Sequence, residues 1–254
     1  MLIRIKKKNL GLLFIAIALV SFMSIIHYTY GDATGATLTN VSTTQKGAAS
    51  PDWNNGTKGA IHIVRLTAEQ QDNKWKAYVG NVSSTFVLDD ADDYSIYQWS
   101  ISDFTGQVYI TRDGSVTWGT VDCASVANKE SEDTALGHTS TSEDSVNSTF
   151  VSTSHKDFTI GTNQINDGDC FSTATWANDT TQTPSATTPF TEVLLWDSTG
   201  GDMIYTTFVE TDASSYRADG SPGTTYDFQA IVPEDADAGD PTLTYYFYLE
   251  LTSN

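Results

Sequence analysis

Carboxylate side chains are the residues of this sequence best suited to do chemistry, because they gather in short loop-like segments. Several carboxylate oxygens from one loop form the hard ligand set that calcium prefers. The sequence therefore predicts two candidate calcium sites, one made of Asp89, Asp90, Asp92 and Asp93 and the other of Glu234, Asp235, Asp237 and Asp240. A smaller pair, Asp167 and Asp169, lies beside Cys170.

A solvated turn remains the simpler alternative for each acidic cluster, because Asp is a common turn residue. The segment that starts at Asp235 begins like an EF-hand loop, but Tyr246 stands where the bidentate Glu is required. We expect no tightly bound cofactor, with calcium as the one candidate ligand.

Motifs of the common enzyme classes do not occur in the sequence. It contains no Gly-x-Ser-x-Gly, no His-Glu-x-x-His, no Gly-x-x-x-x-Gly-Lys-Ser/Thr and no Gly-x-Gly-x-x-Gly. His62, His138 and His155 have no sequence context typical of an oriented catalytic base. We expect a protein that is not an enzyme, and a secreted hydrolase of unfamiliar type is the weakest alternative.

Covalent modification is indicated by the cysteines and by a repeated short motif. Cys123 and Cys170 are the only two cysteines, and in an exported chain they are expected to form one disulfide. The Asn-x-Ser/Thr motif of N-glycosylation occurs at Asn40, Asn55, Asn81, Asn147 and Asn178.

The N-terminal segment has the order of a secretory signal. Basic residues at positions 4–8 precede the uncharged apolar run Leu10–Ile26, and a polar stretch of small residues follows. Residues 1–31 are therefore interpreted as a signal peptide, with cleavage before Asp32, or as an uncleaved signal anchor. The protein is expected to be secreted or held at the cell surface, and to meet the membrane only through residues 10–26 if the signal remains.

The charge of the chain excludes some classes of partner. Lys and Arg number 13 against 32 Asp and Glu, a formal net charge of −19. A surface this acidic repels nucleic acid and anionic lipid. No nucleic-acid partner is expected.

The segments that position the candidate site residues mostly have the sequence patterns of β-strands. Leu243–Leu251 reads LTYYFYLEL and alternates with the period of a half-buried strand. Glu192–Trp196 and Met203–Glu210 flank a Gly-containing loop, which predicts a hairpin. Thr224–Val232 is expected to pair with the final strand.

The predicted architecture is an all-β antiparallel sandwich, either one large or two packed, in residues 60–254. Residues 32–59 are rich in Gly, Ser, Thr and Asn and are interpreted as a flexible polar arm. Residues 124–157 are interpreted as a polar surface excursion that the disulfide pins at its base, with a short helix near Ala124–Lys129.

Three segments of the chain read WKAYVGNVSSTFVLDD, WSISDFTGQVYIT and TYDFQAIVPEDADAGDPTLTYYFYLEL. They resemble exported β-sandwich proteins of archaeal cell surfaces, including subunits of extracellular filaments. The resemblance implies a β-sandwich and a structural role, and it transfers no functional residue. The processing site of type IV pilins is absent, because Lys8 is followed by Asn9, Leu10 and Gly11.

These observations favour an exported structural protein that associates with copies of itself in a filament or surface layer. Assembly by strand addition, with the arm 32–59 or an edge strand completing a neighbour's sheet, is the expected mechanism. A surface module that binds glycans or surface proteins, or a calcium-dependent adhesin, is the alternative. Exposed aromatic side chains at Trp53, Tyr246 and Tyr248 would stack on sugars in that case.

Overall fold

The computed structural model of the chain describes residues 34–35, 38, 71–92, 94–101, 104–178, 180–210, 225–235 and 243–253. Strands make up most of the regular structure in these ranges, and every pair of strands is antiparallel. The all-β prediction is confirmed. The segment 1–31, most of the arm 32–59, and the residues Trp53 and His62 lie outside the described residues.

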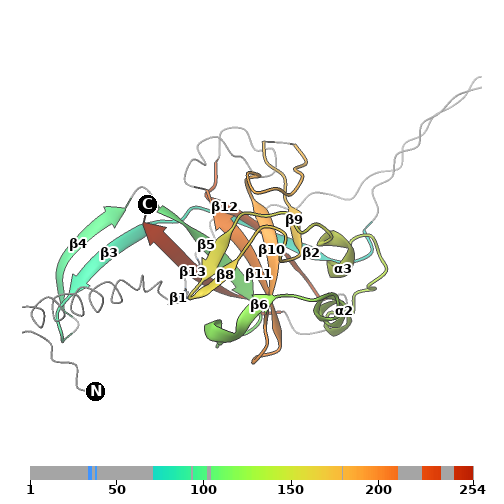
Figure 1. Cartoon of the computed structure of the whole chain (residues 1–254), viewed down its shortest axis with the longest axis horizontal. Helices are drawn as coiled ribbons and strands as arrows, with labels where there is room; N and C mark the ends of the chain where they lie inside the picture. Colours follow the sequence, from blue (N-terminus) through green and yellow to red (C-terminus); the bar gives the residue numbers. More distant parts are fainter. Residues whose placement is uncertain are drawn as a thin grey trace, which may run out of the picture. The chain divides into compact units, whose positions relative to one another are not determined.

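A seven-stranded sheet forms the centre of the fold (Figure 1). Its order is β1 (Thr34–Gly35), β13 (Tyr246–Ser253), β5 (Phe104–Thr111), β11 (Asp202–Val209), β10 (Thr191–Asp197) and β6 (Val121–Cys123), and β9 (Ser172–Ala174) also pairs with β10. β6 and β9 pair with different parts of β10, one with Leu195–Asp197 and the other with Thr191–Val193. They therefore share one edge of the sheet.

β10 and β11 form the hairpin that the sequence predicts. Their register runs from Glu192 opposite Thr207 to Asp197 opposite Asp202. In the connecting loop, Gly201 has a φ of +80°, a value that glycine adopts without strain. The Asp197 carboxylate accepts hydrogen bonds from the backbone N–H groups of Thr117 (2.9 Å) and Thr199 (2.9 Å), which fixes the loop against the segment before β6.

A second pair of strands covers one face of the large sheet. β12 (Phe228–Pro233) pairs with β2 (Trp75–Gly80), so the expected pairing of the last two strands is wrong. β13 pairs instead with β5 in the centre of the large sheet. The apolar core between these layers includes Val108, Ile110, Leu194, Tyr205, Val209, Phe228, Ala230, Val232 and Phe247.

A short hairpin covers the opposite face. β7 (Phe158–Ile160) and β8 (Asn163–Ile165) pair with each other, and their apolar side chains are buried. The core on this side consists of Tyr109, Val121, Phe158, Ile160, Ile165, Cys170, Val193, Leu195, Ile204 and Phe208. The large sheet is therefore buried on both faces, which explains why its central strands are apolar on both sides.

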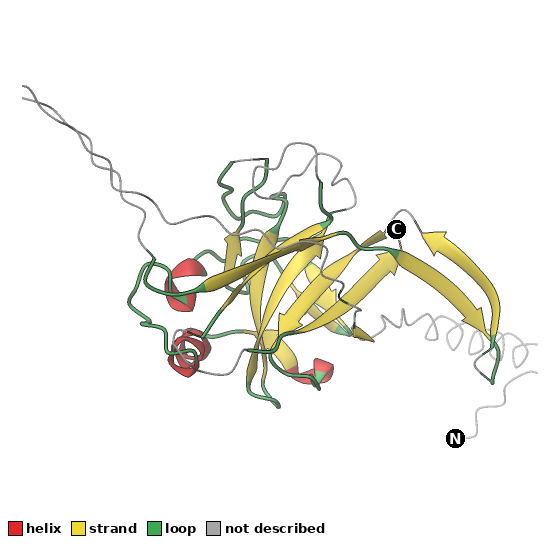
Figure 2. Ribbon diagram, turned by 180° about the vertical axis from the view of Figure 1, so that it is seen from behind, coloured by secondary structure: helices red, strands yellow, loops and turns green. Residues whose placement is uncertain are grey.

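Residues 124–157 contain two helices, the first of which overlaps the short helix predicted near Ala124–Lys129, and apolar side chains of this segment join the core, so it is more than a polar surface excursion. α2 (Val126–Ala135) and α3 (Val146–Thr149) lie together at one end of the β structure (Figure 2). A capping box between Ser125 and Asn128 starts α2. Val146 and Phe150 are fully buried in the first core. The short turn η1 (Trp118–Thr120) precedes β6.

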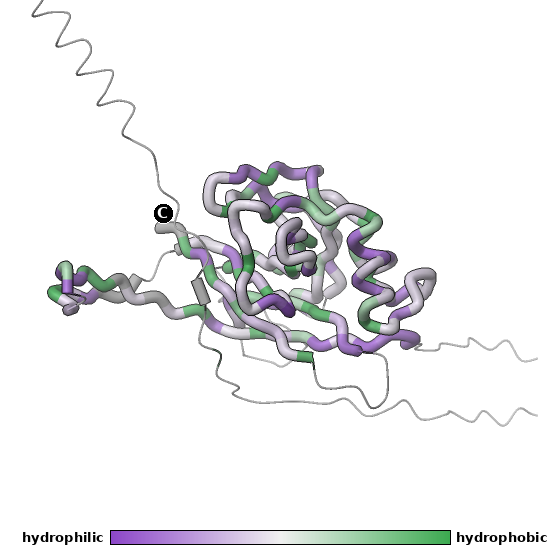
Figure 3. Tube along the Cα trace, turned by 90° about the horizontal axis from the view of Figure 1, so that it is seen from below, coloured by the Kyte–Doolittle hydropathy of each residue, from purple (hydrophilic) through white to green (hydrophobic). Residues whose placement is uncertain are grey.

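The two remaining strands form a separate two-stranded sheet, which we call the β3–β4 ribbon. β3 (Ser84–Asp89) pairs with β4 (Ser95–Ile101), and the register shifts between Leu88 and Asp89. The ribbon carries hydrophobic stretches along its length (Figure 3). Every side chain described in residues 85–98 is exposed.

Candidate assembly interface

Strand β13 packs with both of its faces against the apolar cores of the fold. Tyr245, Phe247, Leu249 and Leu251 pack on the core beneath β12, and Tyr248 packs on the opposite core. This division follows the alternation predicted from the sequence. Gly106 of β5 lies so close to β13 that a Cβ atom there would meet the Glu250 carbonyl oxygen at 2.0 Å. Glycine at this position allows the two strands to approach.

A buried hydrogen bond joins β13 to β5 across the sheet. The Tyr109 hydroxyl donates to Glu250 Oε2 at 2.8 Å, and both side chains are buried. Burial, together with the neighbouring Glu250 carboxylate, raises the pKa of Tyr109 well above its usual value of 10. The phenol therefore keeps its proton and its hydrogen bond over the ordinary pH range.

The two aromatic residues of β13 that were candidates for sugar stacking have different surroundings in the structure. Tyr248 packs edge-on against Trp118, and its hydroxyl donates to the Asp113 carbonyl at 3.2 Å. Tyr246 is 45% exposed and lies against Gly114. Tyr248 thus belongs to the packing of the sheet, and of these two tyrosines only Tyr246 has an exposed ring.

The arm contributes a strand to the edge of the large sheet. Thr34 is opposite Leu249 and Gly35 is opposite Tyr248, in an antiparallel pairing of two residues. β13 itself is eight residues long. A segment from the N-terminal arm is thus a strand partner of β13, on the side away from β5.

The β3–β4 ribbon presents apolar side chains outside the two cores. Five of its large hydrophobic side chains are 45–73% exposed, namely Val87, Leu88, Tyr94, Ile96 and Tyr97. Leu88 is opposite Tyr97 in the register, so these two share one face of the ribbon. A two-stranded ribbon is marginally stable in water by itself, and several exposed large apolar side chains on one such ribbon are typical of an interaction site.

The acidic clusters are described only in part. Asp90 Oδ1 accepts from the backbone N–H groups of Asp92 (2.9 Å) and Tyr94 (3.0 Å), which is a turn-stabilising arrangement. Glu234 pairs with Lys76 at 2.8 Å. Asp93, Asp237 and Asp240 lie outside the described residues.

No group of three or more His, Cys, Asp and Glu side chains in the described ranges could hold a metal ion. Because Asp93, Asp237 and Asp240 lie outside these ranges, the two calcium sites stay predictions. The third acidic pair has local partners: Asp167 accepts from the His155 backbone N–H, and Asp169 from the Asn166 backbone N–H.

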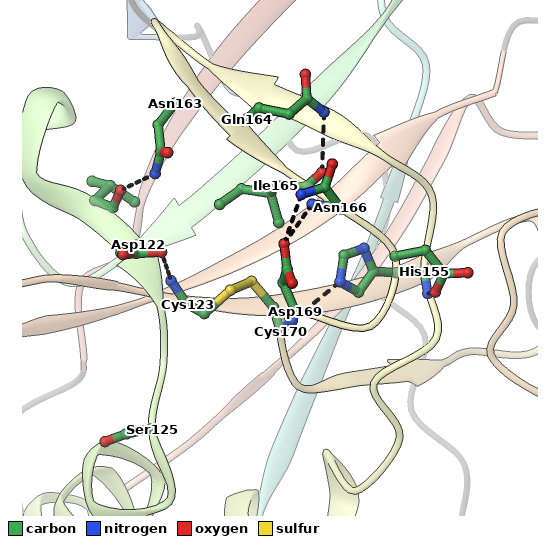
Figure 4. The surroundings of a disulfide bond; sticks show 12 residues. Asp122, Cys123, Ser125, His155, Asn163, Gln164, Ile165, Asn166, Asp169 and Cys170 are labelled. Carbon is green, nitrogen blue, oxygen red and sulfur yellow. Dashed lines mark hydrogen bonds between the residues drawn. A yellow bond between two sulfur atoms is a disulfide. The ribbon is translucent and has the colours of Figure 1, made fainter.

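The disulfide between Cys123 and Cys170 is present, as predicted (Figure 4). It joins β6 to the segment that follows the β7–β8 hairpin. His155 lies beside it, fully buried, where Nε2 accepts from the Cys170 backbone N–H at 3.3 Å and Nδ1 lies 2.8 Å from the Lys156 carbonyl oxygen. Because both ring nitrogens have backbone partners, this histidine supports the loop and is not oriented as a catalytic base.

The described glycosylation motifs lie in three different settings. Asn81 is exposed in the segment between β2 and β3, and Asn178 is exposed on a turn. Asn147 is partly buried as the second residue of α3. Asn40 and Asn55 lie outside the described residues.

Sequence reasoning missed a set of charged residues that are buried beneath α2. Arg112 Nη2 lies 2.5 Å from Glu132 Oε2, and the Tyr205 hydroxyl donates to Glu132 Oε1 at 3.1 Å. Burial raises the pKa of Glu132 above 4.5, although Arg112 opposes this effect. Lys129, Glu132 and Asp133 have helical spacing, which could have indicated one buried face of a helix. Because all three side chains are charged, their sequence did not indicate burial.

His138 is a second buried group beside α2. Its Nε2 lies 2.6 Å from the Glu234 carbonyl oxygen, and its Nδ1 lies 3.7 Å from Asp133 Oδ1. Burial lowers the pKa of His138, but Asp133 and the Glu234 carbonyl outweigh that effect and raise it above 6.5. This histidine joins the helical segment to the end of β12.

No protein-family model, curated protein or solved structure matches the chain. None of the helices in the described residues has the length and apolar character that crossing a membrane requires.

Proposed function

We propose that this chain is an exported structural protein of the cell surface, and that it assembles with copies of itself by exchanging an N-terminal strand. The observation that carries the proposal is the pairing of β1 with β13, Thr34 opposite Leu249 and Gly35 opposite Tyr248. In the assembled state the same pairing forms between two copies, so that the arm of one copy lies on β13 of the next.

Exchange of this strand is energetically easy. A two-residue strand makes few main-chain hydrogen bonds, each worth about 0.5–1.5 kcal/mol net, so it leaves its own sheet readily. Identical contacts re-form in the neighbour, as in domain swapping. Residues 36–74 lie between β1 and β2 and span at most about 140 Å when extended, which is ample to reach a second copy.

The β3–β4 ribbon supports the same proposal as an additional contact. Its exposed apolar side chains would be buried between copies, and that burial strengthens a weak strand exchange. The formal net charge of −19 makes copies repel one another, so salt is expected to favour assembly.

Proline substitutions in the arm test the exchange. Proline removes the backbone N–H and disfavours strand pairing, so Thr34→Pro with Gly35→Pro is expected to abolish assembly without changing the melting temperature of the body. Leu38→Pro is the matched control, because Leu38 is exposed and lies outside β1. Electron microscopy and sedimentation velocity of the surface protein measure the outcome. Assembly that persists in the double variant would sink the exchange mechanism.

A further inference from the structure

Trp176 is an exposed tryptophan two residues before a glycosylation motif. Its side chain is 53% exposed, and within the described residues its indole makes no hydrogen bond or ring contact. Tryptophan is usually well buried, because its large ring gains much from leaving water. An exposed indole offers an apolar ring face on which another apolar surface can pack.

The chain around Trp176 alternates strictly between buried and exposed residues. Thr175 and Ala177 are buried, whereas Trp176 and Asn178 are exposed. Asn178 itself has a left-handed backbone conformation, with a φ of +53°. Trp176 and Asn178 are thus two exposed side chains on either side of the buried Ala177.

The segment is held firmly enough to keep that arrangement. Thr175 bonds the Phe190 carbonyl through its backbone N–H (3.3 Å) and its hydroxyl (3.1 Å). Ala177 and Thr180 exchange backbone hydrogen bonds of 3.1 and 3.0 Å, which closes a tight turn. Asn178 has a φ of +53° in this turn, a conformation that Asn tolerates better than most residues.

The third residue of the motif is also in place. Thr180 is exposed, and its hydroxyl donates to the Asn178 carbonyl at 3.3 Å. The required hydroxyl thus lies beside the acceptor residue on a protruding turn. Asn147, by contrast, is inside α3, where its backbone N–H bonds Asp133 and its carbonyl bonds Lys129.

We propose that Asn178 carries an N-linked glycan whose first sugar stacks on the indole of Trp176. The proposal rests on the export of the chain in the proposed function, because the sugar is added outside the cytoplasm. The apolar face of a pyranose fits an aromatic face, so the stacking removes apolar surface of both partners from water. The first sugar is thereby held against the protein surface, where it covers the turn.

The attachment is a group transfer from an activated sugar, a glycosyl phosphate or diphosphate, by a glycosyltransferase. A bond forms between the Asn178 Nδ2 atom and the anomeric carbon of the sugar. The bond from that carbon to the donor phosphate oxygen breaks, and the phosphate leaves with the electron pair. One proton of the amide goes to a base of the transferase.

Peptide mass spectrometry of the full protein from the surface fraction tests the attachment. After reduction, cleavage before Asp residues separates the two motifs into peptides 144–156 and 169–178. The expected result is a sugar mass on peptide 169–178 and none on peptide 144–156. Thr180→Ala should abolish this mass. Surface protein with an unmodified Asn178 would overturn the proposal without touching the export of the chain, whereas retention of the chain inside the cell would refute both.

Acrylamide quenching of tryptophan fluorescence tests the stacking. A sugar on one face of the indole removes about half of its solvent contact, so Asn178→Gln is expected to raise the quenching of Trp176 about twofold. The increase should vanish in a Trp176→Phe background. Asn147→Gln is the matched control and should leave quenching unchanged. A glycan at Asn178 with no difference in quenching would show that Trp176 does not hold the sugar.

Discussion

Lys129 and Asp133, one turn apart on α2, bind opposite ends of α3. The Asp133 carboxylate accepts from the backbone N–H groups of Val146 (2.7 Å) and Asn147 (3.0 Å). The Lys129 ammonium donates to the carbonyls of Asn147 (3.3 Å) and Phe150 (2.8 Å), and it lies 3.7 Å from the centre of the Phe171 ring. These charges match the dipole of α3, negative at its N-terminus and positive at its C-terminus.

Removal of the Asp133 charge and removal of the Lys129 charge are expected to lower the free energy of unfolding by different amounts. Asp133→Ala leaves two buried N–H groups without a partner and should cost about 2–4 kcal/mol of unfolding free energy. Lys129→Met keeps an apolar stem against Phe171 and removes a buried charge, so it should cost less. Urea denaturation measures both, and equal losses would contradict the distinction.

Loss of the disulfide is expected to be costly. Cys123 and Cys170 are 47 residues apart, and a closed loop of that length contributes about 4 kcal/mol in the chain-entropy model. Cys123→Ser with Cys170→Ser should lower the free energy of unfolding by several kcal/mol. Reduction of the wild-type protein is the control, and it should give a melting temperature close to that of the double variant.

A buried carboxyl in β10 is expected to make stability depend on pH. Glu192 is fully buried and accepts one hydrogen bond, from the Ile231 N–H at 3.0 Å. Burial raises its pKa well above 4.5, although that hydrogen bond opposes the rise. The protonated Glu192 carboxyl therefore contributes its full stabilisation of the folded state below the pKa that it has in the unfolded chain. That stabilisation is lost as the pH rises through the pKa of Glu192 in the folded state.

Glu192→Gln should remove this dependence. Within that pH window the wild-type protein loses up to about 1.4 kcal/mol of unfolding free energy per pH unit relative to the variant. Denaturation at a series of pH values measures the difference. Glu130→Gln, at an exposed position of α2, should leave the profile unchanged, and parallel profiles for the wild type and Glu192→Gln would refute the expectation.

Polar substitutions on the β3–β4 ribbon should weaken association and spare the fold. Leu88→Ser with Tyr97→Ser removes two exposed apolar side chains from one face, and the unfolding free energy should change by only about 0.5 kcal/mol per site. Sedimentation velocity should show a weaker self-association. Val151→Ser, another exposed apolar position outside the ribbon, serves as control. An unaltered association constant in the double variant would exclude the ribbon as a contact.

Local features of the fold were predictable from the sequence. The alternation in Leu243–Leu251 assigned the two faces of β13, and the Gly-containing loop predicted the β10–β11 hairpin. The disulfide followed from the cysteine count. In each case the signal lies within a few residues, or in a residue type with one obvious partner.

Long-range pairing and α2 were not predictable in the same way. Nothing local distinguishes β2 from β13 as the partner of β12, because that choice depends on how the layers pack. The three buried positions of α2 have helical spacing, but all of them are charged: Lys129, Glu132 and Asp133. Partners supplied by distant segments, such as Arg112 for Glu132, make the burial of these charges tolerable. The pairing of the arm with β13 of the same chain was not predicted, because the arm was expected to complete the sheet of a neighbouring copy.

The position of β5 between β11 and β13 sets the order of events during synthesis. β5 pairs with β13 through residues as distant in the chain as Tyr109 and Glu250, 141 positions apart. The centre of the sheet therefore stays open until β13 has left the ribosome, and pairing over such a separation is slow. A chain that cannot close its sheet early stays unfolded for longer, which would suit the export that we propose.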